Sequence, residues 1–272
     1  MNPAYLIPRI IRHFMPETLA EWMKKKKIII KAGMETLEPL AAAQRYLKYF
    51  QQSEITIDSK TILIFGYGGN FTTACELLNA GAQKIILCER EDFPALHISN
   101  EALVQYPQYF IREQDTDQPD PSRLLCYHQD IRALAKRSDV EKADLIISSS
   151  VFEHLDDVEG ITTALFKLTK PTGLHLHFVD LRDHYFKYPF EMLTFSSSTW
   201  KNWLNPTSNL NRYRIPQYRA AFEKHFHSVA ITILESEPHA FAVKKDKIRT
   251  EFLSGDDVLD CATIIAIKAT SQ

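Results

Sequence analysis

The sequence lacks the features that mark several large protein classes. Lys and Arg total 32 against 34 Asp and Glu, a formal net charge of −2, so no basic surplus favours a nucleic-acid partner. No apolar run reaches the ~18 residues that a transmembrane helix needs. The N-terminus lacks the basic region, apolar stretch and cleavage site of a signal peptide. We therefore expect a cytoplasmic protein with no transmembrane segment and no nucleic-acid partner.

Cysteine is also scarce, and its spacing excludes the common metal motifs. The four cysteines stand too far apart for a metal knuckle or a CxxC pair, so we expect reduced core residues. They are Cys75, Cys88, Cys126 and Cys261. His175 and His177 alternate along one predicted strand and share a face. Because no third ligand accompanies them, we predict packing residues and no metal site.

Short apolar runs alternate with amphipathic segments from Thr61 onward. Continuous apolar strands that alternate with helices indicate a parallel sheet covered on both faces. We therefore predict an α/β fold with a doubly wound, mostly parallel, seven-stranded Rossmann-like sheet. The expected strands lie near residues 61–66, 84–88, 123–127, 143–149, 173–179, 228–235 and 260–268. The expected helices lie near residues 71–80, 94–105, 130–137, 158–169 and 216–226.

Two segments fall outside this alternation. Residues 1–58 form an N-terminal extension that we predict to be mostly helical, because "PETLAEWMKK" and "TLEPLAAAQRYLKYFQQ" carry helical start and spacing signals. Residues 180–214 interrupt the main domain, residues 59–272, after its fifth strand. Their aromatic content opposes disorder, and loops of this length often serve as lids. We predict an inserted aromatic cap.

The first strand runs into a glycine-dense turn, "ILIFGYGGNF". Three of the eight glycines fall here, at Gly66, Gly68 and Gly69, and glycine lets the backbone turn sharply close to a ligand. The helix that begins near Phe71 points its N–H groups at the same place, which indicates a nucleotide-binding loop. A dinucleotide loop needs a third glycine where Phe71 stands, so NAD is disfavoured. No Gly-Lys-Ser/Thr follows, which excludes a P-loop.

Acidic residues end the next two strands. Glu89 follows Gly68 by 21 residues, and an acid there commonly accepts hydrogen bonds from a ribose diol. The alternative is an exposed loop acid. Asp130 ends the third strand, where it could cap the helix that starts at Ile131, bind the adenine amino group, or do both.

These motifs together resemble the class I S-adenosylmethionine-dependent methyltransferases over roughly residues 55–270. The resemblance rests on "ILIFGYGGN", "ILCER", "HQD" and the "FEHL" and "LTKPTG" elements at Phe152–Leu155 and Leu168–Gly173. It implies that the domain 59–272 binds S-adenosyl-L-methionine. The implied cofactor residues are Gly66, Tyr67, Gly68, Gly69, Asn70, Glu89, Arg90, Asp130, Ile131, Ser148 and Ser149.

Two positions depart from the family pattern. Ile64 stands where the family usually has an acid that helps to hold the amino-acid end of the cofactor, and Asn70 replaces the usual third glycine. Asn70 can still adopt left-handed backbone angles and supply polar groups. We expect the methionine end to be held partly from elsewhere, with backbone groups at Ser148 and Ser149 and residues of the N-terminal helices as candidates.

Methyl transfer to a hydroxyl requires a base beside the methyl donor. We expect it at the carboxyl ends of strands four and five. His184 is the first catalytic candidate, with Asp183 or Asp180 as an orienting partner, and His154 is the second. The resemblance implies that His154 supports the cofactor loop. Each histidine could instead be a satisfied core or loop residue.

The cap supplies the candidate substrate residues. The "DLRDHY" tract and the aromatic stretch after it resemble a bacterial subgroup of the family. Rings and guanidinium groups there could cover a planar, sugar or anionic substrate, or they could form a second small core with surface arginines. The candidates are Arg182, Tyr185, Trp200, Trp203, Arg212 and Arg214.

The function expected from these features is methylation of a small molecule or glycan, on oxygen. A nicotinamide-dependent oxidoreductase is opposed by Phe71 and by the missing Tyr-x-x-x-Lys pair. A non-catalytic partner protein that kept the fold stays open as an alternative, because Ile64 and Asn70 stand in the expected cofactor loop.

Overall fold

The computed structural model contains a seven-stranded sheet with the strand order β5-β2-β1-β6-β7-β9-β8. It describes residues 3–16, 18–19, 23, 38–91, 98–113, 115–184 and 188–271. The strands from β5 to β7 are parallel, and β9 is antiparallel to both of its neighbours. The predicted doubly wound, mostly parallel sheet is therefore confirmed. Its strands are β5 (Leu124–His128), β2 (Lys84–Glu89), β1 (Thr61–Phe65), β6 (Ala143–Ser149), β7 (Thr169–Asp180), β9 (Ala262–Thr270) and β8 (Ser228–Ser236).

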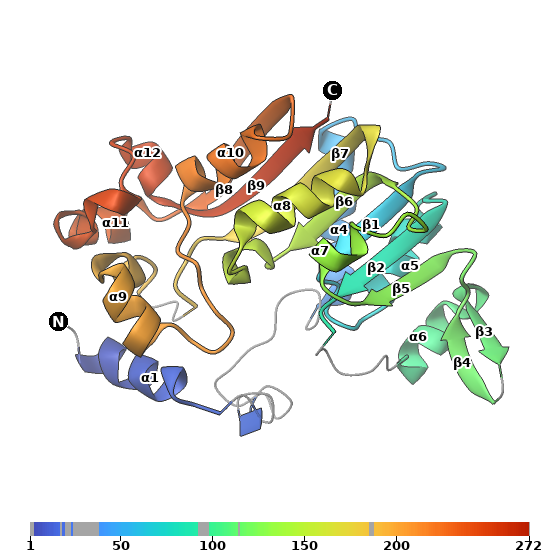
Figure 1. Ribbon diagram of the computed structural model, residues 1–272, viewed down its shortest axis with the longest axis horizontal. Coiled ribbons are helices and arrows are strands. Elements are labelled where there is room, and N and C mark those ends of the chain that lie inside the picture. The colour runs from blue at the N-terminus through green and yellow to red at the C-terminus, as the bar shows by residue number, and fades with distance from the viewer. Residues whose placement is uncertain are drawn as a thin grey trace.

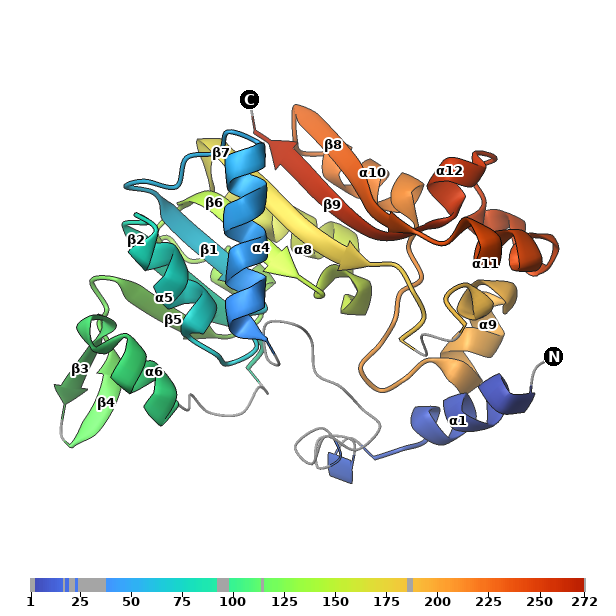
Figure 2. The same cartoon turned by 180° about the vertical axis from the view of Figure 1, so that it is seen from behind.

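Helices cover both faces of the sheet (Figures 1 and 2). Strand β1 feeds both cores, because successive side chains of a strand point to opposite faces. Ile62 and Ile64 join one core, and Leu63 and Phe65 join the other. This two-sided burial explains why the strands read as continuous apolar runs. The covering helices are α4 (Pro39–Gln52) and α5 (Thr72–Asn79) on one face, and α7 (Ile131–Leu134), α8 (Val158–Lys167) and α10 (Ile215–Glu223) on the other.

All seven predicted strands are present, but some boundaries and additions differ. Strand β7 begins at Thr169, where it pairs with Ala143 before a register shift, instead of near residue 173. A polar hairpin, β3 (Phe110–Glu113) and β4 (Thr116–Pro119), was not predicted. Residues 94–97 of the helix expected over 94–105 lie outside the described residues, and the later part forms α6 (Asn100–Gln105). The segment between β8 and β9 contains α11 (Pro238–Lys244) and α12 (Asp257–Asp260).

The N-terminal extension supplies two described helices that pack in different places. Helix α4 packs beside α5 against the sheet, whereas α1 (Pro3–His13) lies beside α9 at one end of the molecule (Figure 1). Tyr5 of α1 shares a small core with Phe190 and Trp200 of the cap. The "PETLAEWMKK" segment lies largely outside the described residues. The cap elements are η3 (Glu191–Thr194), α9 (Ser197–Thr199) and the π-helical turn η4 (Trp200–Leu204).

The cysteines occupy the interior, as predicted. Cys75, Cys88 and Cys261 are buried, Cys126 is half-buried, and all four are free thiols. Burial raises the pKa of both Cys75 and Cys88 to about 12, so these thiols are unreactive near neutral pH. Across the described part of the chain, no helix is both long and apolar enough to cross a membrane.

Candidate functional site

The glycine turn has the backbone geometry that its sequence predicts. Gly66, Gly68 and Gly69 have φ angles of 74°, 67° and 76°, in the left-handed region that favours glycine. A Cβ on Gly66 would lie 2.5 Å from Cγ2 of Val151, so the turn lies against the segment that follows β6. The close approach leaves no room for a side chain at Gly66.

Asn70 supplies a polar side-chain group, as expected, but without the left-handed backbone angles that it could have adopted. It is absent from the residues with positive φ, so it does not use left-handed angles. Its Oδ1 instead accepts a hydrogen bond from the Thr72 N–H at 2.8 Å, at the start of α5. The side-chain oxygen therefore pairs with the first N–H group of α5 from the residue before its N-cap, Phe71.

The aromatic residues of the turn are buried beneath it. Phe71 is 1% exposed and meets the Phe110 ring edge-on, with centroids 5.5 Å apart. Tyr67 is 2% exposed, and its hydroxyl lies 3.0 Å from His128 Nε2. Both rings pack in the core shared with α4 and α5, so they anchor the glycine turn to that core.

Glu89 faces the glycine turn from the end of β2. Its Oε2 accepts a hydrogen bond from the Gly68 N–H at 3.1 Å, and its Oε1 accepts one from the Arg90 N–H at 3.1 Å. Desolvation raises the pKa of this carboxyl, while the two backbone hydrogen bonds oppose the rise. The arrangement presents an acceptor where a ribose diol would lie against such a turn.

Asp130 caps α7, as predicted. Its Oδ1 accepts a hydrogen bond from the Arg132 N–H at 2.7 Å, and the Arg132 side chain pairs with the same carboxylate at 2.5 Å. Hydrogen bonds from Arg132 lower the pKa of Asp130. Ile131 is 2% exposed and belongs to the core. Recognition of adenine at this edge stays a prediction.

Ser148 belongs to a buried hydrogen-bonded chain between β6 and β7. Ser148 Oγ lies 2.8 Å from His177 Nδ1, and His177 Nε2 lies 3.1 Å from His175 Nδ1. His175 Nε2 lies 2.7 Å from Thr169 Oγ1, which itself donates to the carbonyl of Leu165. Thr169 Oγ1 must therefore accept from His175 Nε2. His175 Nδ1 then accepts from His177 Nε2, and His177 Nδ1 accepts from the Ser148 hydroxyl.

Both histidines of that chain are neutral. Burial lowers the pKa of His177 to about 3 and that of His175 well below its ordinary value. Each ring then carries its hydrogen on Nε2, which satisfies every member of the chain. The two residues pack within the sheet, which agrees with their predicted packing role.

A second cluster gathers beyond the carboxyl ends of β6 and β7. Glu153, His154 and His184 bring one ligand-type atom each within 4.8 Å of one another, and the two rings lie 4.9 Å apart. His154 Nδ1 lies 2.7 Å from the carbonyl oxygen of Asn209, so Nδ1 carries the hydrogen and Nε2 keeps its lone pair. One carboxylate and two imidazoles could hold a divalent cation in this geometry.

His184 is held as a neutral ring in this cluster. Desolvation by the surrounding protein, followed by repulsion from the neighbouring His154 ring, lowers the pKa of His184. The lowered pKa keeps the ring unprotonated near neutral pH, and it also makes the ring a weaker proton acceptor than a solvated histidine. Glu153 is a buried neighbour that the sequence did not single out, although it stands inside the "FEHL" element.

The two aspartates expected to orient His184 have other partners as well. Asp183 is fully buried, accepts a hydrogen bond from the Tyr5 hydroxyl and pairs with Arg9, which joins it to α1. Asp180 accepts from Arg182, with Nη2 and Oδ2 2.7 Å apart. An orienting contact between either aspartate and His184 stays a prediction.

The cap residues divide between core and surface. Arg214 is 2% exposed and donates to the carbonyls of Leu181, Asp260 and Ala262. Arg212 donates to two cap carbonyls, and Trp200 is 3% exposed. Trp203 is 55% exposed, and Tyr185 lies outside the described residues. Trp200 thus belongs to the second small core of the alternative interpretation, whereas Arg212 and Arg214 are buried instead of lying at the surface. A substrate contact of these residues stays a prediction.

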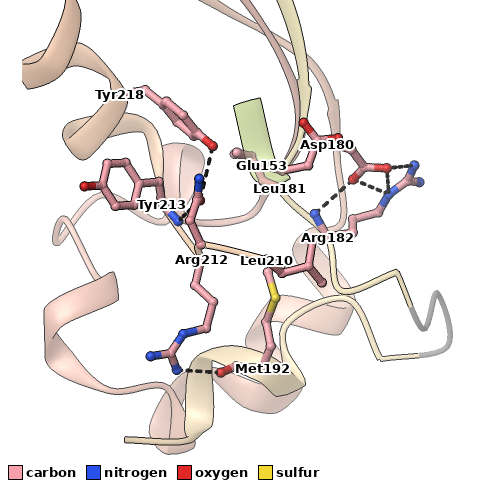
Figure 3. Close-up of a pocket in the computed structure, with 10 residues that line it drawn as sticks. Glu153, Asp180, Leu181, Arg182, Met192, Leu210, Arg212, Tyr213 and Tyr218 are labelled. Atoms are coloured by element: carbon pink, nitrogen blue, oxygen red, sulfur yellow. Dashed lines mark hydrogen bonds and ion pairs between the residues drawn. The ribbon is translucent and has the colours of Figure 1, made fainter. Parts of the chain in front are cut away.

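A small cavity lies between the cap and the ends of the strands (Figure 3). Its volume is about 10 Å³, room for a single water molecule. Glu153, Asp180 and Tyr218 supply polar groups to its wall. Arg182 lines it too and is held by Asp180, as the dashed lines in Figure 3 show.

Similar solved structures are methyltransferases, although sequence comparisons return nothing. No protein-family model matches the chain, and no curated protein matches it. A candidate O-methyltransferase from Nostoc punctiforme has a TM-score of 0.53 and 12% identity, covering 97% of this chain and 67% of that one. Phosphoethanolamine N-methyltransferase 2 from Haemonchus contortus, in complex with phosphomonomethylethanolamine and S-adenosylhomocysteine, has a TM-score of 0.53 and 13% identity. The match covers 97% of this chain and 60% of the Haemonchus contortus chain.

This likeness defines the class of fold. This chain has a seven-stranded sheet in which β9 is antiparallel between β7 and β8, and two structures that match 97% of it with a TM-score of 0.53 are methyltransferases. The chain therefore has the class I methyltransferase fold. Its glycine turn and Glu89 lie beside β1, where the order of connections along the sheet reverses between β1 and β6.

Proposed function

We propose that the protein is an S-adenosylmethionine-dependent methyltransferase that acts on a small molecule or a glycan, on oxygen. The observation that carries this proposal is the pairing of the left-handed glycine turn with the Glu89 carboxylate at the switch point of the sheet. The proposal includes the bacterial subgroup with the "DLRDH" tract and a cytoplasmic location. The likeness in fold to two methyltransferase structures supports it.

The residues at the turn fit the adenosine half of the cofactor. Gly66, Gly68 and Gly69 leave the backbone open to a close approach, and Glu89 offers two acceptor oxygens to ribose hydroxyls. Asp130 and Ile131 lie at the end of the neighbouring strand, where an adenine ring would pack. When bound, the cofactor supplies an electrophilic methyl group on a sulfonium.

His184 is the proposed general base. Its unprotonated ring lies beside His154 and Glu153 beyond the ends of β6 and β7, where it could take the proton from an acceptor hydroxyl as the oxygen attacks. Asn209 fixes the neighbouring His154 through Nδ1, which keeps that ring in one orientation beside His184. Proton removal by a positioned imidazole contributes roughly 10²–10⁴-fold to such reactions.

Calorimetric titration tests the proposal directly. S-adenosylhomocysteine and S-adenosylmethionine should bind saturably, and NAD should not bind, because Phe71 fills the place of the third dinucleotide glycine. Glu89→Ala should weaken binding of both sulfur ligands. Absence of binding by either sulfur ligand would refute the proposed function.

A non-catalytic partner protein with this fold is the second candidate. Buried Ile64, where the family usually has an acid, is the observation that favours it. A partner protein that lost the cofactor would fail the same titration while keeping its fold, which circular dichroism would show.

A further inference from the structure

The glycine turn leaves the amino-acid end of the cofactor without its usual acidic partner. Ile64 is 1% exposed and packs in the core beneath α4 and α5. The methionine moiety carries a carboxylate and an ammonium group, and a buried carboxylate requires a cationic or hydrogen-bonding partner. At the carboxyl end of β6, Arg45 is a cationic side chain that contacts Ser149.

Arg45 belongs to α4, which crosses the face of the sheet in Figure 2. Its guanidinium carbon lies 4.2 Å from the centroid of the Phe178 ring, and Nη2 donates to Ser149 Oγ. Its Nε is buried and has no hydrogen-bond partner among the described residues. None of the described carboxylates forms an ion pair with it. A half-buried guanidinium thus keeps an unused donor.

The position of this guanidinium follows from the strand register. Ile64 of β1 pairs with Ile147 of β6, and beyond this pair Gly66 lies against Val151, two residues after Ser149. The start of α4 is fastened to the start of α5, since Thr73 Oγ1 donates to the Pro39 carbonyl at 3.1 Å. Helical side chains point back towards the N-terminus of their helix, which directs Arg45 to the carboxyl edge. Arg45 therefore lies at the carboxyl end of β6, whose following segment contacts the glycine turn.

We propose that Arg45 binds the carboxylate of the methionine moiety and replaces the anchor that Ile64 cannot provide. The guanidinium would use its Nε and Nη donors in a two-point contact with that carboxylate. Ser149 Oγ, now an acceptor for Arg45, would then be available to the ammonium group beside it. The inference rests on the proposed cofactor and assigns the half of the site that the family pattern leaves open.

The test compares two adenosine thioethers by calorimetry, one with the amino-acid end and one without it. S-adenosylhomocysteine carries the carboxylate, and 5′-methylthioadenosine lacks it. Arg45→Met should weaken the binding of S-adenosylhomocysteine about tenfold or more, because a charge-assisted hydrogen-bonded pair is lost. It should leave the affinity for methylthioadenosine within about twofold, because adenosine contacts do not involve Arg45. Arg45→Lys should recover part of the lost affinity, since lysine restores the positive charge but cannot donate two parallel hydrogen bonds to the carboxylate.

The matched control for Arg45→Met is an arginine that lies far from the proposed site. Arg112→Met, on the exposed hairpin, removes an equal charge and should change neither affinity. Equal S-adenosylhomocysteine affinity for Arg45→Met and the wild type would overturn the inference, as would an equal loss for both ligands, which indicates a structural role. If the wild type binds methylthioadenosine no more weakly than S-adenosylhomocysteine, the carboxylate has no anchor and the inference falls. Failure of the wild type to bind either ligand would overturn the proposed function as well.

Discussion

The ionisation of Glu89 controls the proposed ribose contact. Desolvation raises the pKa of this carboxyl above its ordinary value, so it protonates at a higher pH than a solvated glutamate does. The ionised form is acceptor-only, and protonation removes one acceptor position. We predict that the affinity for S-adenosylhomocysteine falls as the pH decreases through this raised pKa. Calorimetry at several pH values checks it, and Glu89→Gln should bind weakly with this part of the pH dependence removed.

A substitution of His184 should affect methyl transfer without affecting cofactor binding. We predict that His184→Ala keeps its S-adenosylhomocysteine affinity and loses roughly 10²–10⁴-fold in methyl transfer, the usual contribution of a general base. The assay follows labelled methyl transfer from S-adenosylmethionine to a panel of hydroxylated small molecules and glycans. The exposed His227→Gln serves as the matched control. Unchanged transfer by His184→Ala would remove this residue from the mechanism.

The cation geometry of the same cluster gives an independent check. If His184 acts directly as the base, a chelator should leave methyl transfer unchanged, and added zinc should inhibit by occupying Glu153, His154 and His184. Loss of transfer on chelation, with recovery on addition of a divalent ion, would instead make these side chains metal ligands.

At the scale of elements, the His175–His177 chain links β6 to β7 and makes stability depend on pH. An unfolded histidine binds a proton near pH 6.5, while His177 in the folded protein resists protonation down to about 3. The unfolded state therefore binds more protons in this interval, and stability falls as the pH decreases from about 6.5 towards 3. The loss approaches about 1.4 kcal/mol per pH unit for His177 within this interval. Urea unfolding should show a shallower pH dependence for His177→Gln and an unchanged one for His227→Gln.

Helix α1 is held to the cap by a buried charge pair. Asp183 is fully buried, and Arg9 is 5% exposed. Replacing one partner leaves the other charge buried without compensation, which typically costs about 3 kcal/mol or more. We predict that Asp183→Asn loses about this much stability and exposes α1 to proteolysis. The exposed Asp139→Asn should do neither, and wild-type stability of Asp183→Asn would show that the pair does not hold α1.

At the scale of the whole molecule, the sheet could be predicted from the sequence and much of the cap could not. Buried parallel strands produce continuous apolar runs, so β1 and β6 were visible, whereas the hairpin at 110–119 is polar and carries no such signal. Arg214 read as a surface or substrate residue because its partners are backbone carbonyls more than 30 residues away, which no local pattern reveals. Arg45 likewise looks like any arginine in an amphipathic helix. Its proposed role depends on the tertiary contact with Ser149 at the end of β6, just before the segment that contacts Gly66.

The most direct test of the central claim is a crystal structure of the protein grown with S-adenosylhomocysteine. The account predicts the adenosine across the glycine turn, with the ribose hydroxyls on Glu89, the amino-acid carboxylate on Arg45 and the sulfur directed towards His184. Density for the ligand at another place, or an empty turn at a ligand concentration far above the calorimetric dissociation constant, would contradict it.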